Sequence, residues 1–169
     1  MVQVGQADFD GDHPLSGVAL QRAIEARAFA AGGGDHHAPA QSLLGFLEDH
    51  PPGDLPAARY RPGLRPARLA ALFPEAVAAA LREGLAAFCQ KMPGLADPKS
   101  VLIGAETRTS SPVRIVRGPD GCSPQAAGLF PAGEGAGYAG GIVSSAVDGI
   151  RQADALIAWL LAKPAARTP

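Results

Sequence analysis

The stretch Gly128-Leu-Phe-Pro-Ala-Gly-Glu-Gly-Ala-Gly-Tyr-Ala-Gly-Gly-Ile142 carries the strongest structural signal in this sequence. Residues 128–132 resemble a β-strand, glycines crowd residues 133–141, and a helical apolar repeat starts at Ile142. Glycine lacks a Cβ, so its backbone amide can approach a phosphate closely, and a helix N-terminus adds unpaired N–H groups. The order of strand, glycine turn and helix therefore predicts a cradle for a diphosphate. The alternative is a plain tight turn before a helix.

The turn contains a G-x-G-x-x-G pattern at Gly135, Gly137 and Gly140. In a Rossmann fold this pattern opens a βαβ unit of about 30 residues. Here the expected helix reaches about Ala162, and the residues after it, 163–169, are too few for a second strand. We therefore expect the turn to close a nucleotide-binding fold rather than to open one.

Two segments, Ile103–Ile115 and Gly128–Ile150, resemble the C-terminal end of a group of FAD-dependent dehydrogenases that are distantly similar to glutathione-reductase-type flavoproteins. Weaker similarity covers Gly17–Gly34, Ala38–Gln41 and Tyr60–Gly63. Members of that group also carry an N-terminal FAD-binding βαβ unit with its own glycine fingerprint, which this sequence lacks. The resemblance therefore implies the C-terminal part of such a flavoprotein, with FAD as the cofactor of the full-length protein.

The resemblance also implies site residues. The glycine amides of the turn would hold the FAD diphosphate, and Glu134 at the strand end would accept hydrogen bonds from the ribityl chain. The implied cofactor-binding residues are Gly133, Glu134, Gly135, Ala136, Gly137, Gly140, Gly141 and Ile142. The alternative for Glu134 is a surface carboxylate at a helix N-terminus.

A second candidate site lies in the segment Arg108-Thr-Ser-Ser-Pro-Val-Arg114. Arginine recognises carboxylates and phosphates with two parallel hydrogen bonds, so Arg108, Ser110 and Arg114 would bind an anionic substrate. Spacing alone equally allows a polar β-turn, and the resemblance favours the site. No nucleophile and base stand out as a pair, which disfavours a hydrolase and suits an enzyme whose flavin carries the chemistry.

The expected fold is α/β, with a partial FAD-binding domain (closing strands plus the C-terminal helix) joined to a mostly helical substrate-side segment. We expect residues 1–99 to form the substrate-side segment and residues 100–165 the C-terminal part of the FAD-binding domain. The expected helices run from Ser16 to the glycines at 32–34, between Pro66 and Pro74, for about 17 residues after Pro74, and over 141–162 with a buried apolar stripe. The expected strands are 101–105, 112–116 and 128–132, and residues 38–63 are expected to be an irregular connector.

Composition narrows the class of protein. The formal net charge is −1 with no run of like charges, so nothing indicates nucleic acid or an anionic membrane as a partner. No signal segment follows Met1 and no apolar run reaches about 18 residues, so we expect a cytoplasmic protein.

No metal site is expected from the acidic residues, histidines and cysteines. The acidic residues Asp8, Asp10 and Asp12 lack the glutamate of a calcium loop, and Asp35-His36-His37 is interpreted as a polar loop. Cys89 is expected to be a small buried hydrophobe, and Asp148 is expected to pair weakly with Arg151.

Two functions from different classes remain open. The first is a portion of an FAD-dependent oxidoreductase acting on an unknown small molecule, with a nicotinamide as the possible electron donor. The alternative is a flavin-free binding or scaffolding module that is inactive alone. In that case its exposed strand edges would associate with a partner or with a second copy of the chain.

Overall fold

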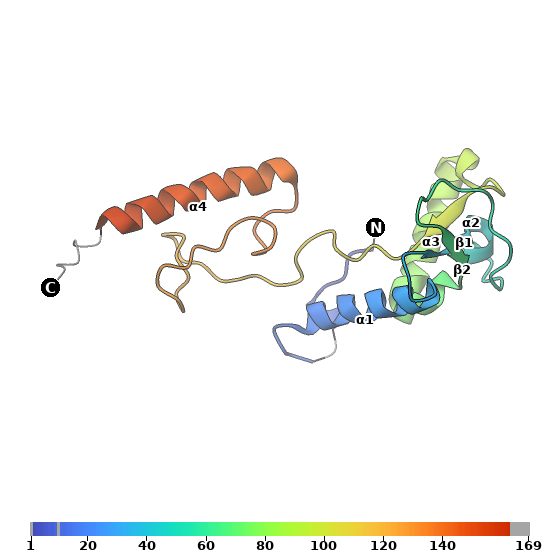
Figure 1. Ribbon diagram of the computed structural model, residues 1–169, viewed down its shortest axis with the longest axis horizontal. Helices are drawn as coiled ribbons and strands as arrows, with labels where there is room; N and C mark the ends of the chain where they lie inside the picture. The colour runs from blue at the N-terminus through green and yellow to red at the C-terminus, as the bar shows by residue number, and fades with distance from the viewer. Residues whose placement is uncertain (1, 10, 163–169) are drawn as a thin grey trace. The chain divides into compact units, whose positions relative to one another are not determined.

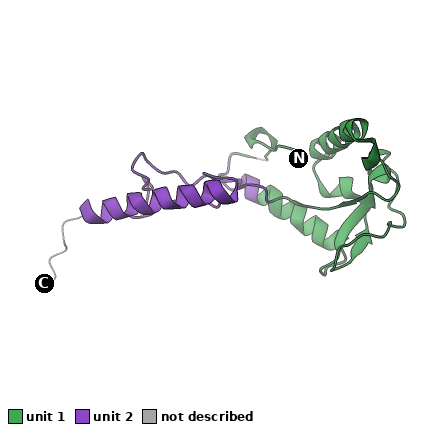
Figure 2. Cartoon of the chain, turned by 90° about the horizontal axis from the view of Figure 1, so that it is seen from above, with its two compact units in different colours: residues 1–12, 19–107 green, residues 13–18, 108–169 purple. Residues whose placement is uncertain are grey.

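The structure is a computed structural model that describes residues 2–9 and 11–162. Two expectations reach beyond this range: Asp10 of the acidic loop and residues 163–165 of the expected second domain lie outside the described residues. The chain forms two compact units, residues 1–12 with 19–107 (unit 1) and residues 13–18 with 108–169 (unit 2), coloured separately in Figure 2. Together they contain a three-stranded sheet and several helices, which is a mixed α/β content.

The elements follow one another as shown in Figure 1. In chain order they are the 3-10 helix η1 (Gln6–Asp8), α1 (Ser16–Ala31), β1 (Ala38–Ser42), α2 (Leu43–Leu47), β2 (Leu64–Pro66), the 3-10 helix η2 (Leu69–Leu72), α3 (Glu75–Lys91), the 3-10 helix η3 (Pro93–Leu95), β3 (Val101–Ile103) and α4 (Ile142–Ala162). The expected helices after Ser16, between Pro66 and Pro74, and after Pro74 are confirmed as α1, η2 and α3.

The sheet of unit 1 is built around β1. This strand pairs in parallel with β2 and antiparallel with β3, so that Ala40 lies opposite both Pro66 and Ile103. Ala40 is fully buried, which its methyl side chain allows at the centre of three short strands. Ser42 ends β1 and caps α2, because its Oγ accepts a hydrogen bond from the Gly45 amide at 3.1 Å.

Apolar side chains from three helices and a 3-10 helix form the core of unit 1. Ala28 of α1, Phe46 of α2, and Leu69 and Leu72 of η2 are buried together, and α3 adds Leu81 and Leu85. Figure 1 shows α2 and α3 close together, in agreement with their contacts, and α2 also contacts β1. Burial of these side chains removes apolar surface from water, which is the main force that stabilises such a unit.

Two expectations for unit 1 need correction and a third is confirmed. Residues 38–47 form β1 and α2 rather than an irregular connector. Strand β1 forms despite Pro39 because it pairs with strands that are distant in sequence. Cys89 is half-buried rather than buried. Strand β3 is confirmed within the expected range 101–105, and it pairs with β1, so unit 1 extends to Thr107.

Unit 2 consists of α4 and a long irregular segment. The expected strands 112–116 and 128–132 are wrong: the described part of unit 2 contains only an isolated bridge between Ser123 and Ala126. A strand needs a ladder of backbone partners, but Ile115 makes one such bond, to Ala136 at 3.1 Å. Gly128 has a φ of 85°, which bends the chain where the second strand was expected.

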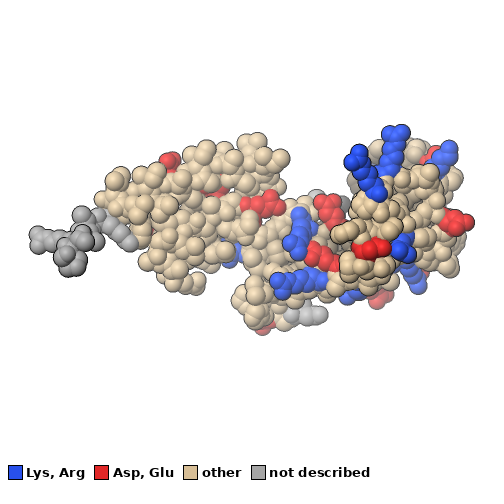
Figure 3. All heavy atoms as spheres, viewed as in Figure 1, with Lys and Arg blue, Asp and Glu red and all other residues tan. Residues whose placement is uncertain are grey.

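Helix α4 spans the range expected for the last helix, but the side expected to be buried is exposed. The expected buried stripe is exposed, with 92% of Ile142, 64% of Ile150 and 82% of Leu161 accessible. Asp148 and Gln152 are the buried residues of this helix. The space-filling view shows few charged side chains over α4 (Figure 3), so the outer face of the helix is apolar.

Candidate functional site

The glycine turn directly precedes α4. Within it the Gly137 amide donates to the Glu134 carbonyl at 2.9 Å and the Tyr138 amide donates to the Gly133 carbonyl at 3.1 Å. Helix α4 starts at Ile142, the residue after Gly141, and the Ser144 hydroxyl donates to the Gly141 carbonyl at 3.0 Å. The expected order of turn and helix is therefore confirmed, whereas an irregular segment stands in place of the strand.

Asp148 of α4 fixes the start of the turn. Its carboxylate accepts two hydrogen bonds from the Arg117 guanidinium, at 2.6 and 3.0 Å, and a third from the Gly133 amide at 2.8 Å. The Arg117 hydrogen bonds, followed by the Gly133 amide, lower the pKa of Asp148 to about 2, and the same pair raises the pKa of Arg117. This side chain therefore stays ionised and connects the helix to the turn and to Arg117. The expected weak pair with Arg151 is a minor influence beside it.

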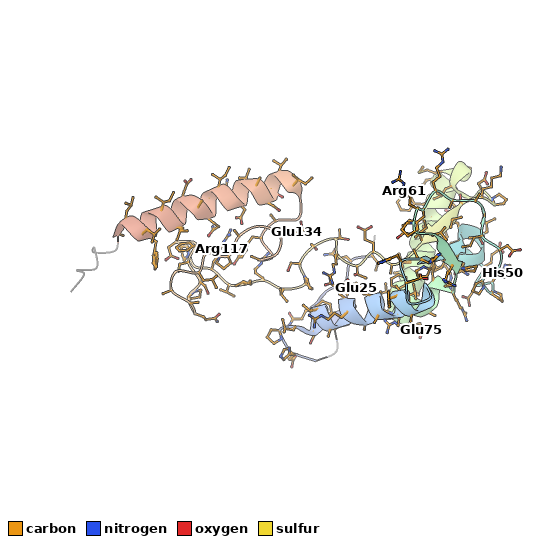
Figure 4. All side chains as sticks on the ribbon, viewed as in Figure 1. Glu25, His50, Arg61, Glu75, Arg117 and Glu134 are labelled. Carbon is orange, nitrogen blue, oxygen red and sulfur yellow. The ribbon has the colours of Figure 1, made fainter. Side chains whose placement is uncertain are left out.

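Tyr138 lies between two arginines. The guanidinium of Arg117 lies 3.7 Å from the centre of the Tyr138 ring, and that of Arg114 lies 5.0 Å from it. The Tyr138 hydroxyl accepts a hydrogen bond from the Arg117 amide at 3.1 Å, and Arg114 donates to the Gly137 carbonyl at 3.1 Å. These cation–π and polar contacts hold the middle of the turn. Figure 4 labels Arg117 and Glu134, both on the irregular segment that accompanies α4.

The glycines of the turn have different surroundings. Gly137 has a φ of 81°, and a Cβ at this position would lie 2.4 Å from the Val113 carbonyl oxygen, so only glycine packs here. A Cβ on Gly135 or Gly140 would meet nothing within 4 Å. Gly137 is therefore required by the fold of unit 2, whereas Gly135 and Gly140 leave the backbone open to a bound molecule.

A surface depression of about 730 Å³ lies at the start of α4. It is lined by Tyr138, Gly141, Ile142, Val143, Ser144, Val147, Asp148 and Arg151. The first N–H groups of a helix have no partner within the helix, so they are free to bind an anion at this end. The Ser145 hydroxyl nearby on α4 is buried and has no hydrogen-bond partner within the described residues. Backbone donors, the Arg151 side chain and apolar side chains thus line one depression, together with the ionised Asp148 carboxylate.

Of the expected cofactor residues, Gly141 and Ile142 line this depression. Glu134, Gly135 and Gly140 are exposed on the turn, and Gly133 is held by Asp148. Ala136 is buried. The sequence did not indicate as site residues the other residues of the depression, Tyr138, Val143, Ser144, Val147, Asp148 and Arg151.

The expected substrate residues separate into two groups. Arg108 and Ser110 are exposed on the segment that follows Thr107, whereas Arg114 turns toward Gly137 and Tyr138. The neighbour of Ser110, Ser111, reaches the turn instead: its hydroxyl lies 3.3 Å from the Gly135 carbonyl. Arg114 thus has a structural role that the sequence did not indicate.

Two further properties bear on the class of protein. Within the described ranges, no three or more His, Cys, Asp or Glu side chains come together in a way that could hold a metal ion. None of the described helices combines the length and the apolar character needed to cross a membrane.

Comparison with known proteins adds the family. Residues 1–109 match the family described as "FAD-dependent protein, C-terminal domain-like". The chain is also 42% identical over 159 residues to a protein of Clostridium beijerinckii named "Uncharacterized protein", a match that covers 93% of this chain and 30% of the relative. The chain therefore spans about a third of the length of this relative, and the family match includes all of unit 1.

Proposed function

The chain belongs to the family of FAD-dependent proteins with this C-terminal region, and from that premise we propose that it is the C-terminal portion of an FAD-dependent oxidoreductase of the glutathione-reductase-like kind. In this proposal the turn at 133–142 holds the diphosphate and ribityl parts of FAD. The observation that carries the proposal is the depression at the start of α4, next to glycines with open Cα atoms.

The residues present suit the chemistry of this cofactor. The amides of Gly140, Gly141 and Ile142 and the helix N-terminus are donors for a diphosphate. Glu134 is exposed at the turn and its carboxylate can accept hydrogen bonds from hydroxyl groups. When FAD is bound, its flavin supplies the electron-transfer chemistry, and the side chains of this region bind and orient it.

The exposed apolar face of α4 supports a larger assembly around this site. Ile142, Val143 and Ile150 are each more than half exposed, which is unusual for so many neighbouring apolar side chains. In the proposal this face packs against the rest of the FAD-binding domain, because the relative contains far more chain than is matched here. The chain alone would then bind FAD weakly, because the contacts from the rest of that domain would be missing.

Substrate binding is the remaining part of the proposal. Arg108, Ser110 and Arg114 would bind an anionic small molecule, and a nicotinamide would be the electron donor. Arg114 also contacts the turn, so it would connect the substrate side to the cofactor side. The domain assignment of residues 1–99 and 100–165 belongs to the same proposal.

The alternative function is supported by the same apolar face. A flavin-free module would use the exposed side of α4, or the edges of β2 and β3, to associate with a partner or a second copy. Such a protein would form dimers that are insensitive to FAD. Sedimentation velocity with and without FAD separates this outcome from the flavin-binding proposal.

The test of the proposed function is a FAD titration of the 169-residue chain and of two valine variants. Gly140→Val should leave the fold intact and lower FAD affinity by about tenfold or more, because its side chain enters open space that the cofactor needs. Gly94→Val is the matched control, since Gly94 also has open space around it but lies in unit 1. Equal FAD affinity of Gly140→Val and the unchanged chain would contradict the proposal. Sub-micromolar binding by the chain alone would contradict the expectation that this chain binds FAD weakly without the rest of the domain.

A further inference from the structure

A second cluster of polar side chains lies in unit 1, in the loop between α1 and β1. The Asp35 carboxylate accepts a hydrogen bond from the His37 amide at 2.8 Å and lies 2.7 Å from His37 Nδ1. Its other oxygen accepts from Arg65 at 3.2 Å. The bond from the His37 amide, then the bond to the His37 ring, lower the pKa of Asp35 to about 2. In the neutral ring, an ionised acceptor beside Nδ1 favours the tautomer with its proton on Nδ1, which leaves Nε2 without a proton.

Glycines from two segments make room for this arrangement. Gly63 has a φ of 97°, and a Cβ there would lie 2.4 Å from His37 Cδ2 and 2.7 Å from its Nε2. Gly33, also at 97°, would place a Cβ 2.5 Å from Arg65 Nε, and Gly32 would place one 2.2 Å from the His37 carbonyl oxygen. The backbone is therefore shaped closely around His37 and its neighbours. The Ala38 amide joins the two segments by donating to the Gly63 carbonyl at 3.0 Å.

A pocket of about 570 Å³ opens over the cluster. It is lined by Asp35, His36, His37, Arg61 and Pro62. Arg61 is exposed and forms no ion pair with any residue that the structure describes; Figure 4 labels it on the segment before β2. Nε2 of His37 likewise has no hydrogen-bond partner among the described residues. The pocket thus combines a guanidinium that has no ion-pair partner among the described residues with an imidazole nitrogen that the favoured tautomer makes a hydrogen-bond acceptor.

These two groups define the chemistry of a ligand. A guanidinium pairs best with a carboxylate or a phosphate, whereas a bare imidazole nitrogen needs an O–H or N–H donor. A small molecule with a carboxylate and a neighbouring hydroxyl satisfies both. We propose that this pocket of unit 1 binds a small hydroxycarboxylate, with Arg61 pairing with the carboxylate and His37 Nε2 accepting from the hydroxyl. This site is separate from the glycine turn and does not require flavin.

The first test measures the tautomer of His37 by long-range ¹H–¹⁵N NMR of the full chain. At about pH 8.5, where an ordinary imidazole is neutral, the spectrum should show a proton on Nδ1 and a bare Nε2. Asp35→Ala, which removes the acceptor at Nδ1, should remove this preference. A proton on Nε2 in the unchanged protein would overturn the proposal, because the acceptor would then be absent.

The second test titrates the chain with lactate, with propionate and with inorganic phosphate. Lactate should shift the His37 ring signals saturably, and propionate, which lacks the hydroxyl, should bind about fivefold more weakly. Arg61→Gln should weaken lactate binding by about tenfold, whereas Arg59→Gln, an exposed arginine outside the pocket, should not.

Two results of these titrations would overturn the proposal. One is the absence of any lactate-induced shift up to roughly 50 mM. The other is a response to phosphate or propionate equal to that to lactate, which would show that any anion binds at the site.

Discussion

The two units of this chain bury opposite kinds of side chain. Unit 1 buries Phe46, Leu69 and Leu72 in an apolar core, while the helix of unit 2 buries Asp148 and Gln152 and exposes Ile142 and Leu161. An apolar core stabilises a unit without outside help. A helix with a polar inner face and an apolar outer face is instead suited to lie between two bodies of protein. The difference indicates that contacts within unit 1 stabilise it, and that the exposed apolar face of α4 in unit 2 is suited to pack against further protein.

The largest expected effect comes from the core of unit 1. Phe46→Ala should lower the free energy of unfolding of unit 1 by about 3–5 kcal/mol, because it removes a buried ring and leaves a cavity. Urea unfolding followed by residue-resolved NMR measures this. Phe29→Ala, at a side chain that is 57% exposed, is the control and should cost far less. Equal losses for the two variants would show that unit 1 has no distinct core.

The next effect concerns the polar interior of unit 2. Asp148→Asn should destabilise the segment around the turn by about 2 kcal/mol, since the Arg117 charge loses its partner. Hydrogen exchange of the Gly133 and Tyr138 amides should accelerate, while unit 1 amides should not change. Asp154→Asn, on the exposed side of α4, is the control. Unchanged exchange in Asp148→Asn would mean that the ion pair does not hold the turn.

The same carboxylate makes unit 2 sensitive to acid. The pKa of Asp148 is lowered in the folded chain to about 2 from an ordinary value of 3.8. Its stabilising effect is therefore complete above about pH 4 and is lost as the pH falls toward 2. Hydrogen exchange of the turn amides measured across this range should show the loss, and the Asp148→Asn variant should show a flatter profile. If hydrogen exchange in the variant kept its steep dependence on pH, a group other than Asp148 would cause the acid sensitivity.

The smallest effect should come from the outer face of α4. Ile150→Ser should change the stability of the chain by no more than about 0.5 kcal/mol, because the side chain is 64% exposed. Thermal unfolding of the chain measures this directly. A loss of about 2 kcal/mol or more would mean that the apolar face is already covered, for instance by a second copy, and would favour the scaffolding alternative.

The sequence allowed the helices to be predicted better than the strands. Periodic apolar residues and the glycines at 32–34 located α1, α3 and α4, because these signals are local. The strands expected at 112–116 and 128–132 did not form, since a strand depends on partners that local sequence does not specify. Strand β1 was missed for the same reason, because its partners lie about 25 and 60 residues further along the chain.

The candidate site could be predicted only where its residues are adjacent in sequence. Gly141 and Ile142 were expected at the start of the last helix and line the depression there. The role of Asp148 was missed, because its partner Arg117 lies 31 residues away and no spacing rule connects them. Likewise, Asp35 and His37 were correctly placed in a polar loop, but Arg65 and Gly63, which complete the cluster, come from another segment.

The most direct test of the flavin site is an NMR map of the backbone amides of the full chain during addition of FAD. The largest shifts should occur at the turn and the first residues of α4, around Gly140–Ser144, even though binding is weak. Adenosine diphosphate, which carries the diphosphate without the flavin, should shift the same amides. Shifts confined to unit 1, or spread evenly over both units with no maximum at the start of α4, would contradict the central claim that this turn binds the FAD diphosphate.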